Sequence, residues 1–324
     1  MTENDTPRNP TPAVSVIIPA YKAADHIAAA LASVMGQSFP DFEVILINDG
    51  SPDSDRLESV IAPYRNRITY LRQPNRGPSA ARNLGIRHAR AEFLAFLDSD
   101  DSWLPEYLAE QVRFQGADPS LDMVYCDALF LGNTSSHGRT FMELCPSNGP
   151  VTFESLLVEQ TQVITSGTLV RRQAVIEAGL FDEDLRCAED HDLWLRMAHR
   201  GCKIAYQRRV LVRHLVRPDS QGSPPGNLIL GEIASLKKLD RELHLDSRVR
   251  SLLTEKLRLA EFVLAWTQGR NCLLLGEYQK ASEFFAQANT LASSPKLRAL
   301  LFGLRIAPRL TGAGAQMWGR IVSR

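Results

Sequence analysis

Short β-branched runs alternate with helix-like stretches from residue 14 onward, and this alternation restricts the fold more than any other feature of the chain. Continuous apolar strands must be covered on both faces, so the pattern predicts βαβ units and an α/β fold with a mainly parallel sheet flanked by helices. Strand-like and helix-like runs follow one another in the order 14–19, 25–37, 42–49, 51–64, 68–73, 78–90 and 92–98.

Polar residues follow three of these predicted strands at their carboxyl ends. They are Pro-Ala-Tyr at 19–21, Asn-Asp-Gly-Ser at 48–51 and Asp-Ser-Asp-Asp at 98–101. Ligands of open α/β sheets bind beyond the carboxyl ends of the strands. The three strand ends therefore predict one composite binding site.

The acids at 98–101 are typical of a site for a hard cation. Two carboxylates in an Asp-x-Asp arrangement can share a divalent ion that prefers oxygen ligands. No His or Cys cluster accompanies them, which favours Mg²⁺ or Mn²⁺ over zinc. In the alternative interpretation Asp100 and Asp101 cap a helix that begins near Pro105, which does not explain all three acids.

Composition excludes some classes of protein. The 37 basic and 37 acidic residues leave no net charge, so a nucleic-acid partner has no global electrostatic support. The five cysteines are odd in number and form no CxxC pair, which indicates reduced thiols and a cytoplasmic protein. Residues 1–13 are polar and proline-rich, as in a disordered leader, and no apolar run reaches the roughly 18 residues of a spanning helix.

Some local signals are weaker. Asp25 is a candidate N-cap, and Ser51-Pro52 would place proline in a first helical turn. Strand candidates at 121–131 and 166–172 enclose a polar loop at 132–149.

The strand pattern stops near residue 225, and residues 226–324 are predicted to be helical. The segment around Gly276, Ala281 and Phe285 resembles a single tetratricopeptide-type hairpin, and the alternative is a plain helical hairpin packed on the preceding domain. These signals predict one domain at 14–225 and a helical region at 226–324.

The C-terminal tail is basic and amphipathic. No acidic residue follows Glu283. An apolar face and a solvated basic face would suit the surface of an anionic membrane, but they would equally suit a helix docked on its own protein. The apolar face consists of Leu297, Leu300, Leu301 and Leu304, and the basic residues are Lys296, Arg298, Arg305, Arg309, Arg320 and Arg324.

A second acidic group begins a predicted amphipathic helix. Glu189, Asp190 and Asp192 would occupy its first turn, where negative side chains are favoured by the exposed backbone N–H groups. Asp190 follows Asp100 by 90 positions.

Three blocks in register resemble family 2 glycosyltransferases, which have the GT-A fold and use nucleotide-sugar donors with inversion. They are the opening segment 14–53, the block 74–101 and the segment 188–201. The resemblance covers residues 14 to about 216, or roughly two thirds of the chain, and leaves the helical region outside it.

The resemblance implies which residues bind the donor nucleotide. Pro19, Ala20 and Tyr21 match the family's nucleotide-binding turn, where the aromatic ring can stack on the base. Asp49 matches the acid that hydrogen-bonds the base, and Arg82 matches an arginine near that base. Taken singly, each position also fits an ordinary structural role.

The resemblance also implies a diphosphate and metal site. Asp98 and Asp100 match the two acids of the family's DxD motif, with the first near the ribose or metal and the second on the metal. Asp101 either assists them or caps the following helix. His214 lies where some relatives place a residue near the metal or diphosphate, although a lone histidine at a strand end is more often structural.

The acidic helix start resembles the family's xED motif, in which Asp190 matches the general base. Such a base removes the proton of the acceptor hydroxyl as it attacks the anomeric carbon, and contributes about 10²–10⁴-fold to the rate. Glu189 would orient the acceptor or support Asp190. Trp194 has two interpretations, a sugar-stacking wall of the acceptor site or a core residue.

These implications lead to one hypothesis and two alternatives. The chain would be a metal-dependent glycosyltransferase acting on a glycan or lipid-linked acceptor in surface polysaccharide or cell-envelope synthesis, with UDP the commonest donor nucleotide of relatives. It would be cytoplasmic, with peripheral contact to the inner face of the plasma membrane. The alternatives are a non-catalytic nucleotide- or sugar-binding module and a nucleotidyltransferase, the latter disfavoured because no Gly-rich phosphate loop is present.

Overall fold

A computed structural model of the chain describes residues 11–217 and 226–308. The chain divides into two compact units, Met1–Pro218 and Asp219–Arg324, which are treated separately below. Most of the predicted leader lies outside the described residues, as do Arg309, Arg320 and Arg324 of the predicted basic tail.

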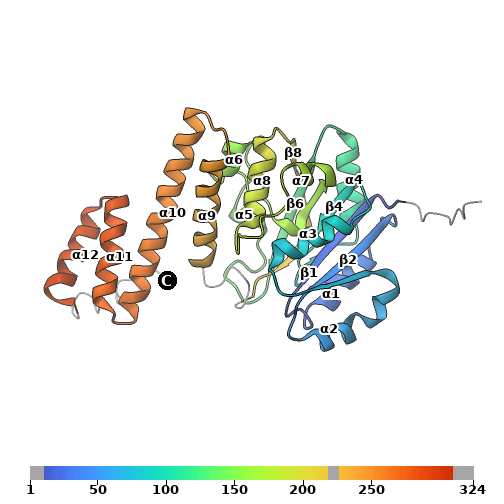
Figure 1. The fold of residues 1–324 in the computed structure, drawn as a ribbon, viewed down its shortest axis with the longest axis horizontal. Coiled ribbons are helices and arrows are strands. Elements are labelled where there is room, and N and C mark those ends of the chain that lie inside the picture. The colour runs from blue at the N-terminus through green and yellow to red at the C-terminus, as the bar shows by residue number, and fades with distance from the viewer. Residues whose placement is uncertain (1–10, 218–225, 309–324) are drawn as a thin grey trace, which may run out of the picture. The chain divides into compact units, whose positions relative to one another are not determined.

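An eight-stranded mixed sheet forms the N-terminal unit (Figure 1). Its order is β3-β2-β1-β4-β7-β6-β8-β5, and the first four strands are all parallel, as the βαβ pattern predicts. β7 runs antiparallel to both β4 and β6, and β5 antiparallel to β8, while β6 and β8 are parallel. The strands are β1 (Val14–Ala20), β2 (Phe42–Asp49), β3 (Thr69–Gln73), β4 (Phe93–Phe96), β5 (Ser102–Trp103), β6 (Met123–Leu131), β7 (Thr168–Arg171) and β8 (Ile204–Leu215).

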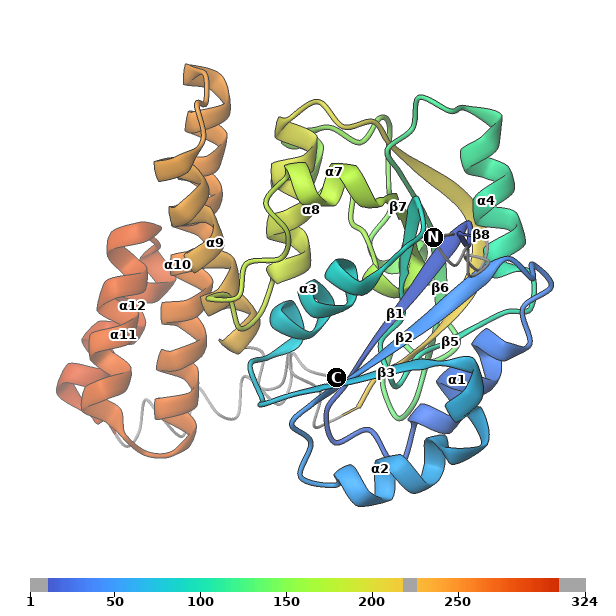
Figure 2. The same cartoon turned by 45° about the vertical axis from the view of Figure 1, so that its right-hand side comes forward.

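Helices cover both faces of this sheet (Figure 2). The side chains on one face of β1, including Val16 and Ile18, pack in the same core cluster as residues of α1. On the opposite face a Cβ added to Gly85 of α3 would lie 2.6 Å from the Ile17 side chain, so α3 approaches the strands closely only because residue 85 is glycine. The helices are α1 (Ile27–Met35), α2 (Ser54–Ile61), α3 (Pro78–His88), α4 (Tyr107–Ala117), α5 (Phe141–Leu144), α6 (Phe153–Leu157), α7 (Arg172–Glu177) and α8 (Glu189–His199), with 3₁₀ turns η1 (Ala62–Arg67) and η2 (Thr165–Gly167).

Two predicted helix starts are wrong in detail. His26, not Asp25, is the N-cap of α1, and the Asp25 carboxylate pairs with Arg56 instead. Pro52 lies before α2, whose N-cap is Asp53. One hydrogen bond joins the loops that follow β1 and β2, since the Asp53 carboxylate accepts from the Ala24 N–H at 3.1 Å. This tertiary contact outweighs the local capping preference at both helix starts.

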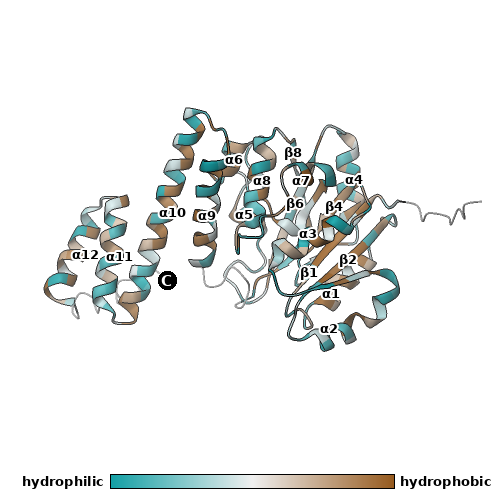
Figure 3. Cartoon of the chain, viewed as in Figure 1, coloured by the Kyte–Doolittle hydropathy of each residue, from teal (hydrophilic) through white to brown (hydrophobic). Residues whose placement is uncertain are grey.

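Four helices form the C-terminal unit: α9 (Gly226–Glu242), α10 (Ser247–Leu274), α11 (Tyr278–Leu291) and α12 (Pro295–Ile306). Gly276, with φ of 77°, makes the turn of the predicted hairpin between α10 and α11. Phe285 is buried between these helices, and a Cβ on Gly269 would lie 2.8 Å from its ring. The hydropathy colouring shows both polar and apolar segments along these helices (Figure 3).

The apolar face predicted for the tail is largely used inside the C-terminal unit. Leu297 and Leu304 of α12 are buried in one cluster with Phe285, so the docked-helix interpretation applies to them. Phe302 and Ile306 remain exposed on the same helix. Within residues 11–217 and 226–308, no helix combines the length and hydrophobicity that crossing a membrane requires.

Candidate active site

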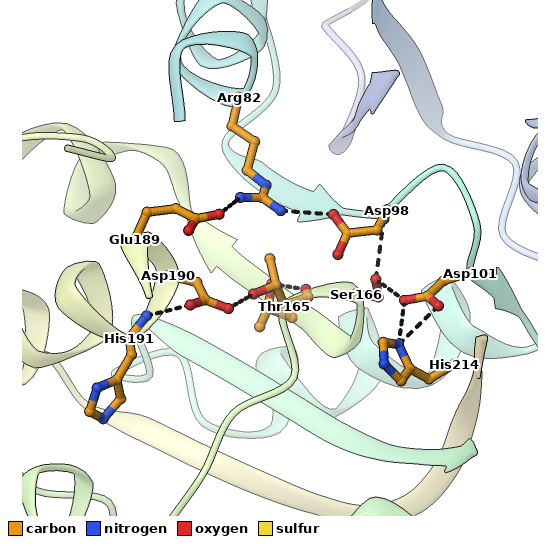
Figure 4. Close-up of polar contacts among 10 residues, drawn as sticks. Arg82, Asp98, Asp101, Thr165, Ser166, Glu189, Asp190, His191 and His214 are labelled. Carbon is orange, nitrogen blue, oxygen red and sulfur yellow. Dashed lines mark hydrogen bonds and ion pairs between the residues drawn. The ribbon is translucent and has the colours of Figure 1, made fainter. Parts of the chain in front are cut away.

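Asp98 and Asp101 lie together beyond the carboxyl end of β4 (Figure 4). Asp98 lies two residues beyond the last residue of this strand, and its side chain is one-third exposed. Its backbone N–H donates to the Ser166 hydroxyl at 3.1 Å, and its carboxylate accepts from Arg82 at 2.8 Å. The end of β4 is therefore fixed to both η2 and α3.

Asp101 is a fully partnered structural acid. It is 1% exposed and accepts hydrogen bonds from the Ser166 hydroxyl at 2.5 Å and the Leu215 N–H at 3.0 Å. Because α4 starts at Tyr107 with Glu106 as its N-cap, the helix-capping interpretation of Asp101 is wrong. Its bonds join the β4 end to the end of β8.

His214 lies beside Asp101, and its contact with a metal or diphosphate stays a prediction. Its Nδ1 is 3.0 Å from Asp101 Oδ1. Burial disfavours the imidazolium, but the hydrogen bond and charge of Asp101 outweigh burial and raise the pKa of His214. The surroundings thus favour the protonated form of His214 more than water does.

The surroundings of Asp100 disfavour the charged form of its carboxylate. Its Oδ2 is 3.1 Å from Arg217 Nε, and its side chain is one-fifth exposed. Burial first, and then the neighbouring carboxylates of Asp101 and Asp98, raise the pKa of Asp100 to about 6. A bound cation would relieve this repulsion.

The donor set fits a hard divalent ion that takes most of its ligands from elsewhere. Asp98 and Asp100 offer partly exposed carboxylate oxygens, the ligand type that Mg²⁺ and Mn²⁺ prefer. No group of three metal-ligating side chains occurs among the described residues. A metal would therefore bind here chiefly with phosphate and water oxygens, and metal binding stays a prediction.

Arg82 connects the two acidic groups. The side chain is buried, with Nη2 2.8 Å from Asp98 and Nη1 2.7 Å from Glu189. Burial raises the pKa of Glu189, although the Arg82 charge opposes the shift. Arg82 was expected beside a nucleotide base, and in the structure its visible role is this bridge.

Asp190 stands in the first turn of α8, as predicted. Its Oδ2 accepts from the Thr165 hydroxyl at 2.6 Å and its Oδ1 from the His191 N–H at 2.7 Å. The side chain is half-buried, and Ala188 at the N-cap has a left-handed φ of 60°. The carboxylate thus has a defined orientation with one donor on each oxygen.

The residues predicted for the nucleotide lie at the ends of β1 and β2. Tyr21 is exposed, with Lys22 Nζ 5.5 Å from its ring centroid, whereas Ala20 is buried and Pro19 is half-buried in β1. Asp49 is 3% exposed and accepts from Gln73 and from the N–H groups of residues 76 and 77, at 2.7 to 2.9 Å. Asp49 therefore holds the loop before α3, and its contact with a base stays a prediction.

Trp194 does not line an open site. Its side chain is 1% exposed, and its ring meets Phe181 edge-on at 6.2 Å between centroids. A buried indole has no free face for a sugar, so the core-packing interpretation applies and the acceptor-wall prediction is corrected.

Sequence reasoning missed three polar residues of the site. Arg217 pairs with Asp100, and Thr165 and Ser166 bond the acids from η2. Their available signal was position: 165 and 166 lie at the start of the strand predicted at 166–172, and 217 follows the strand end expected at His214. Short hydroxyl residues are common in turns, so only the folded arrangement distinguishes these two.

Solved glycosyltransferases share this fold. Staphylococcus aureus TarS, residues 1–349, aligns with a TM-score of 0.63 and 20% identity over 90% of this chain and 86% of its own; it has also been solved with UDP and with UDP-GlcNAc. Pyrobaculum calidifontis mannosyltransferase PcManGT, in complex with GDP-Man and Mn²⁺, aligns with a TM-score of 0.62 and 19% identity over 95% and 88%. These likenesses confirm the predicted GT-A fold and helical C-terminal region.

Sequence relatives point to the same family. An uncharacterized Rickettsia typhi glycosyltransferase is 26% identical over 64% of this chain and 64% of its own length. The Rhizobium meliloti succinoglycan biosynthesis protein ExoW is 46% identical over 29% of this chain and 31% of its own. The match spans less than two thirds of the length of these relatives. Residues 15–178, just over half of the chain, match the family described as glycosyl transferase family 2, and the chain belongs to that family.

Proposed function

We propose that this chain is an inverting, metal-dependent glycosyltransferase. It moves a sugar from a nucleoside diphosphate donor to a hydroxyl of a glycan or lipid-linked acceptor, in the synthesis of a surface polysaccharide or cell-envelope glycan. The observation that carries the proposal is the meeting of two acidic groups, around Asp98 and around Asp190, which Arg82 and η2 connect. Family membership and the polysaccharide-related name of ExoW support it.

The donor end is formed by residues after β1, β2 and β4. The exposed Tyr21 ring offers a face for the base, while Asp49 orders the loop beside it. Asp98 and Asp100 lie beyond the end of β4, where we place the diphosphate, and UDP-GlcNAc and GDP-Man in the structural neighbours support a nucleotide-sugar donor. UDP is our first candidate because the TarS complexes hold it.

Metal would be held by Asp98 and Asp100, with His214 at its edge. When bound, Mg²⁺ or Mn²⁺ neutralises the negative charge of a departing diphosphate. Arg217 already pairs with Asp100, so the protein keeps a second cation at this place. That side chain can pass from Asp100 to a phosphate oxygen when the donor enters.

Asp190 serves the acceptor. Both of its oxygens accept one hydrogen bond, which leaves lone pairs free to take the proton of an attacking hydroxyl. Glu189 is engaged by Arg82 and is buried, so it positions this helix start instead of receiving the proton. One acidic group thus serves the leaving group and the other the nucleophile.

Peripheral contact with an anionic membrane is a further part of the proposal. Phe302 and Ile306 are exposed on α12, where Arg305 adds positive charge. Apolar side chains beside basic ones bind anionic lipid surfaces. A lipid-linked acceptor would be reached at such a surface.

The test is calorimetric titration of the protein with UDP, GDP and dTDP, each with Mn²⁺ or with EDTA. Binding of one nucleotide that requires Mn²⁺ is the expected result and identifies the donor nucleotide. Binding that is equal in EDTA would contradict metal dependence, since Arg82 and Arg217 would then supply enough positive charge at these acids. No binding of any nucleotide would favour a non-catalytic module.

A further inference from the structure

The 3₁₀ turn η2 lies between the two acidic groups and touches both. Its three residues, Thr165–Gly167, connect to the start of β7. In Figure 4 the Thr165 and Ser166 side chains stand between Asp190 on one side and Asp98 and Asp101 on the other. Adjacent residues of one turn thereby contact the predicted base and the predicted diphosphate site.

Thr165 sets the orientation of Asp190. Thr165 is 4% exposed. Its hydroxyl donates to Asp190 Oδ2 at 2.6 Å, while the His191 N–H donates to Oδ1. The two donors grip opposite oxygens, so the carboxylate cannot rotate without losing one of them. A fixed carboxylate presents its remaining lone pairs in one direction, which is the requirement for a positioned base.

Ser166 sets the separation of the strand-end acids. Its hydroxyl accepts from the Asp98 N–H at 3.1 Å and donates to Asp101 Oδ2 at 2.5 Å. The hydroxyl thereby uses its donor and one acceptor position, and the residue is 0% exposed. The backbone at Asp98 and the carboxylate of Asp101 therefore keep a fixed geometry around Asp100.

The turn itself is held rigidly from the opposite side. Trp103 Nε1 donates to the Ser166 carbonyl at 2.7 Å, and Gln111 Nε2 donates to the Gly167 carbonyl at 2.7 Å. Tyr107, whose ring stacks on Trp103 at 4.0 Å between centroids, donates its hydroxyl to the next carbonyl in the chain, at 2.9 Å. Two buried side chains thus anchor the three-residue turn, and a third anchors the first residue of β7 directly after it.

We propose that Thr165 and Ser166 are positioning residues that divide between the two halves of the transfer reaction: Thr165 aims the base Asp190, and Ser166 shapes the donor-side acids. The inference rests on the proposed function, which assigns those acids their roles. Neither residue reacts, because both hydroxyls are committed to the protein.

A purely structural turn would behave differently. Loss of either hydroxyl would then lower stability and would affect turnover and donor binding together. The division of labour predicts instead that Thr165 affects the maximal rate and Ser166 affects donor binding. The split between kcat and the donor KM or Kd is therefore the decisive measurement.

The first experiment compares Thr165→Val, Thr165→Ser and wild type. Release of nucleoside diphosphate is followed with UDP-glucose, UDP-N-acetylglucosamine and GDP-mannose in Mn²⁺, with water as the acceptor of the sugar. Thr165→Val keeps the shape and loses the donor to Asp190, so kcat should fall about 10- to 100-fold with the donor KM unchanged. Thr165→Ser restores the hydroxyl and should recover most of kcat.

Thr161→Val is the matched control. Thr161 is also fully buried in this unit, but its hydroxyl bonds Ser155 instead of an acid. The same substitution there should leave kcat within about twofold. Equal activity of Thr165→Val and wild type, or no recovery in Thr165→Ser, would overturn the role of Thr165.

Ser166→Ala completes the test. Calorimetric titration with UDP or GDP in Mn²⁺ should show a Kd raised about tenfold, with kcat at saturating donor changed much less. Parallel loss of both quantities in both variants would identify η2 as structural only and overturn the inference. Wild type that binds nucleotide but turns over none of the three donors would contradict the proposed function, whereas active wild type with an indifferent Thr165→Val contradicts only the positioning roles.

Discussion

The two units of this chain place their polar and apolar side chains in opposite ways. In the N-terminal unit several charged side chains are buried, among them Arg82 in α3, Asp101 beyond the end of β4 and Glu189 at the start of α8. In residues 226–308 Ser235 is the single buried polar residue. Conversely, nine of the eleven large hydrophobic side chains that are exposed in the described chain belong to the helical unit.

This difference distinguishes a unit that holds buried charged groups at one site from a unit that exposes apolar side chains on its surface. Burial of charge is unfavourable unless every group is paired, and in the sheet unit the paired groups converge on one edge. The helical unit keeps a small apolar core around Phe285 and leaves Trp266, Leu275 and Phe302 in solvent. Substitutions should therefore act on activity in the first unit and on stability or association in the second.

Asp190→Asn should give the largest effect. Loss of the proton acceptor should lower kcat about 10²–10⁴-fold, because the amide keeps the shape but not the basicity. Nucleotide binding in Mn²⁺ should persist, as judged by calorimetry. Asp184→Asn, an exposed neighbour in the same segment, is the control and should retain full activity. Substantial transfer by Asp190→Asn would remove Asp190 as the base.

Arg82→Ala should show how much a buried charge stabilises the sheet unit. The substitution leaves Asp98 and Glu189 without their partner, and a broken buried ion pair costs about 3–5 kcal/mol. Denaturant unfolding measures this loss. The exposed pair formed by Arg76 gives the control, since Arg76→Ala should cost less than about 1 kcal/mol. Equal costs for the two arginines would contradict the importance of buried pairing.

Phe285→Ala tests whether the helical unit contributes stability separately from the sheet unit. Removing this ring from the small core of the helical unit should destabilise that unit by about 3 kcal/mol. Nucleotide binding by the sheet unit should change little at temperatures where both units stay folded. Leu275→Ala, at a position that is 76% exposed, should be nearly neutral. Nucleotide affinity that falls in step with the helical unit's stability would show that the two units do not act separately.

Sequence reasoning predicted the parts of the molecule in which local pattern and chemistry agree. The parallel half of the sheet followed from apolar strands alternating with helices, and the acids at 98, 100 and 190 stand at the element ends where the pattern put them. The antiparallel insertion of β7 between β4 and β6 did not follow, because strand order depends on long-range packing.

Individual side-chain partners were harder to predict than positions. Asp25 is a residue type that often caps helices, but its carboxylate pairs with Arg56. Trp194 follows the acids 189, 190 and 192 in the sequence, but its side chain is buried in the core. Thr165 and Ser166 have no distinctive spacing relative to residues 98, 101 and 190, which are 25 to 68 positions away. Only tertiary structure brings such partners together.

Asp100→Ala tests whether a buried carboxylate of the sheet unit serves metal-dependent nucleotide binding. The Asp100 carboxylate is destabilised by burial and by its acidic neighbours, so it is retained at a cost that a cation would offset. Without it, nucleotide affinity in Mn²⁺ should fall about tenfold, and the difference between Mn²⁺ and EDTA should shrink. The control is Asp118→Ala at an exposed position. Unchanged affinity would contradict the metal assignment.

Phe302→Ser combined with Ile306→Ser should have the smallest effect and tests whether the exposed apolar side chains of the helical unit bind lipid. Each of the two residues is about two-thirds exposed, at 67% and 65%. Losing roughly 1 kcal/mol of burial in a lipid interface should lower binding to anionic vesicles about fivefold. Ile176→Ser, at an exposed apolar position of the sheet unit, should leave vesicle binding unchanged, and nucleotide binding should be normal in both proteins. Equal vesicle recovery of all variants and wild type would show that these side chains serve another contact, and the contrast between the units would then concern stability alone.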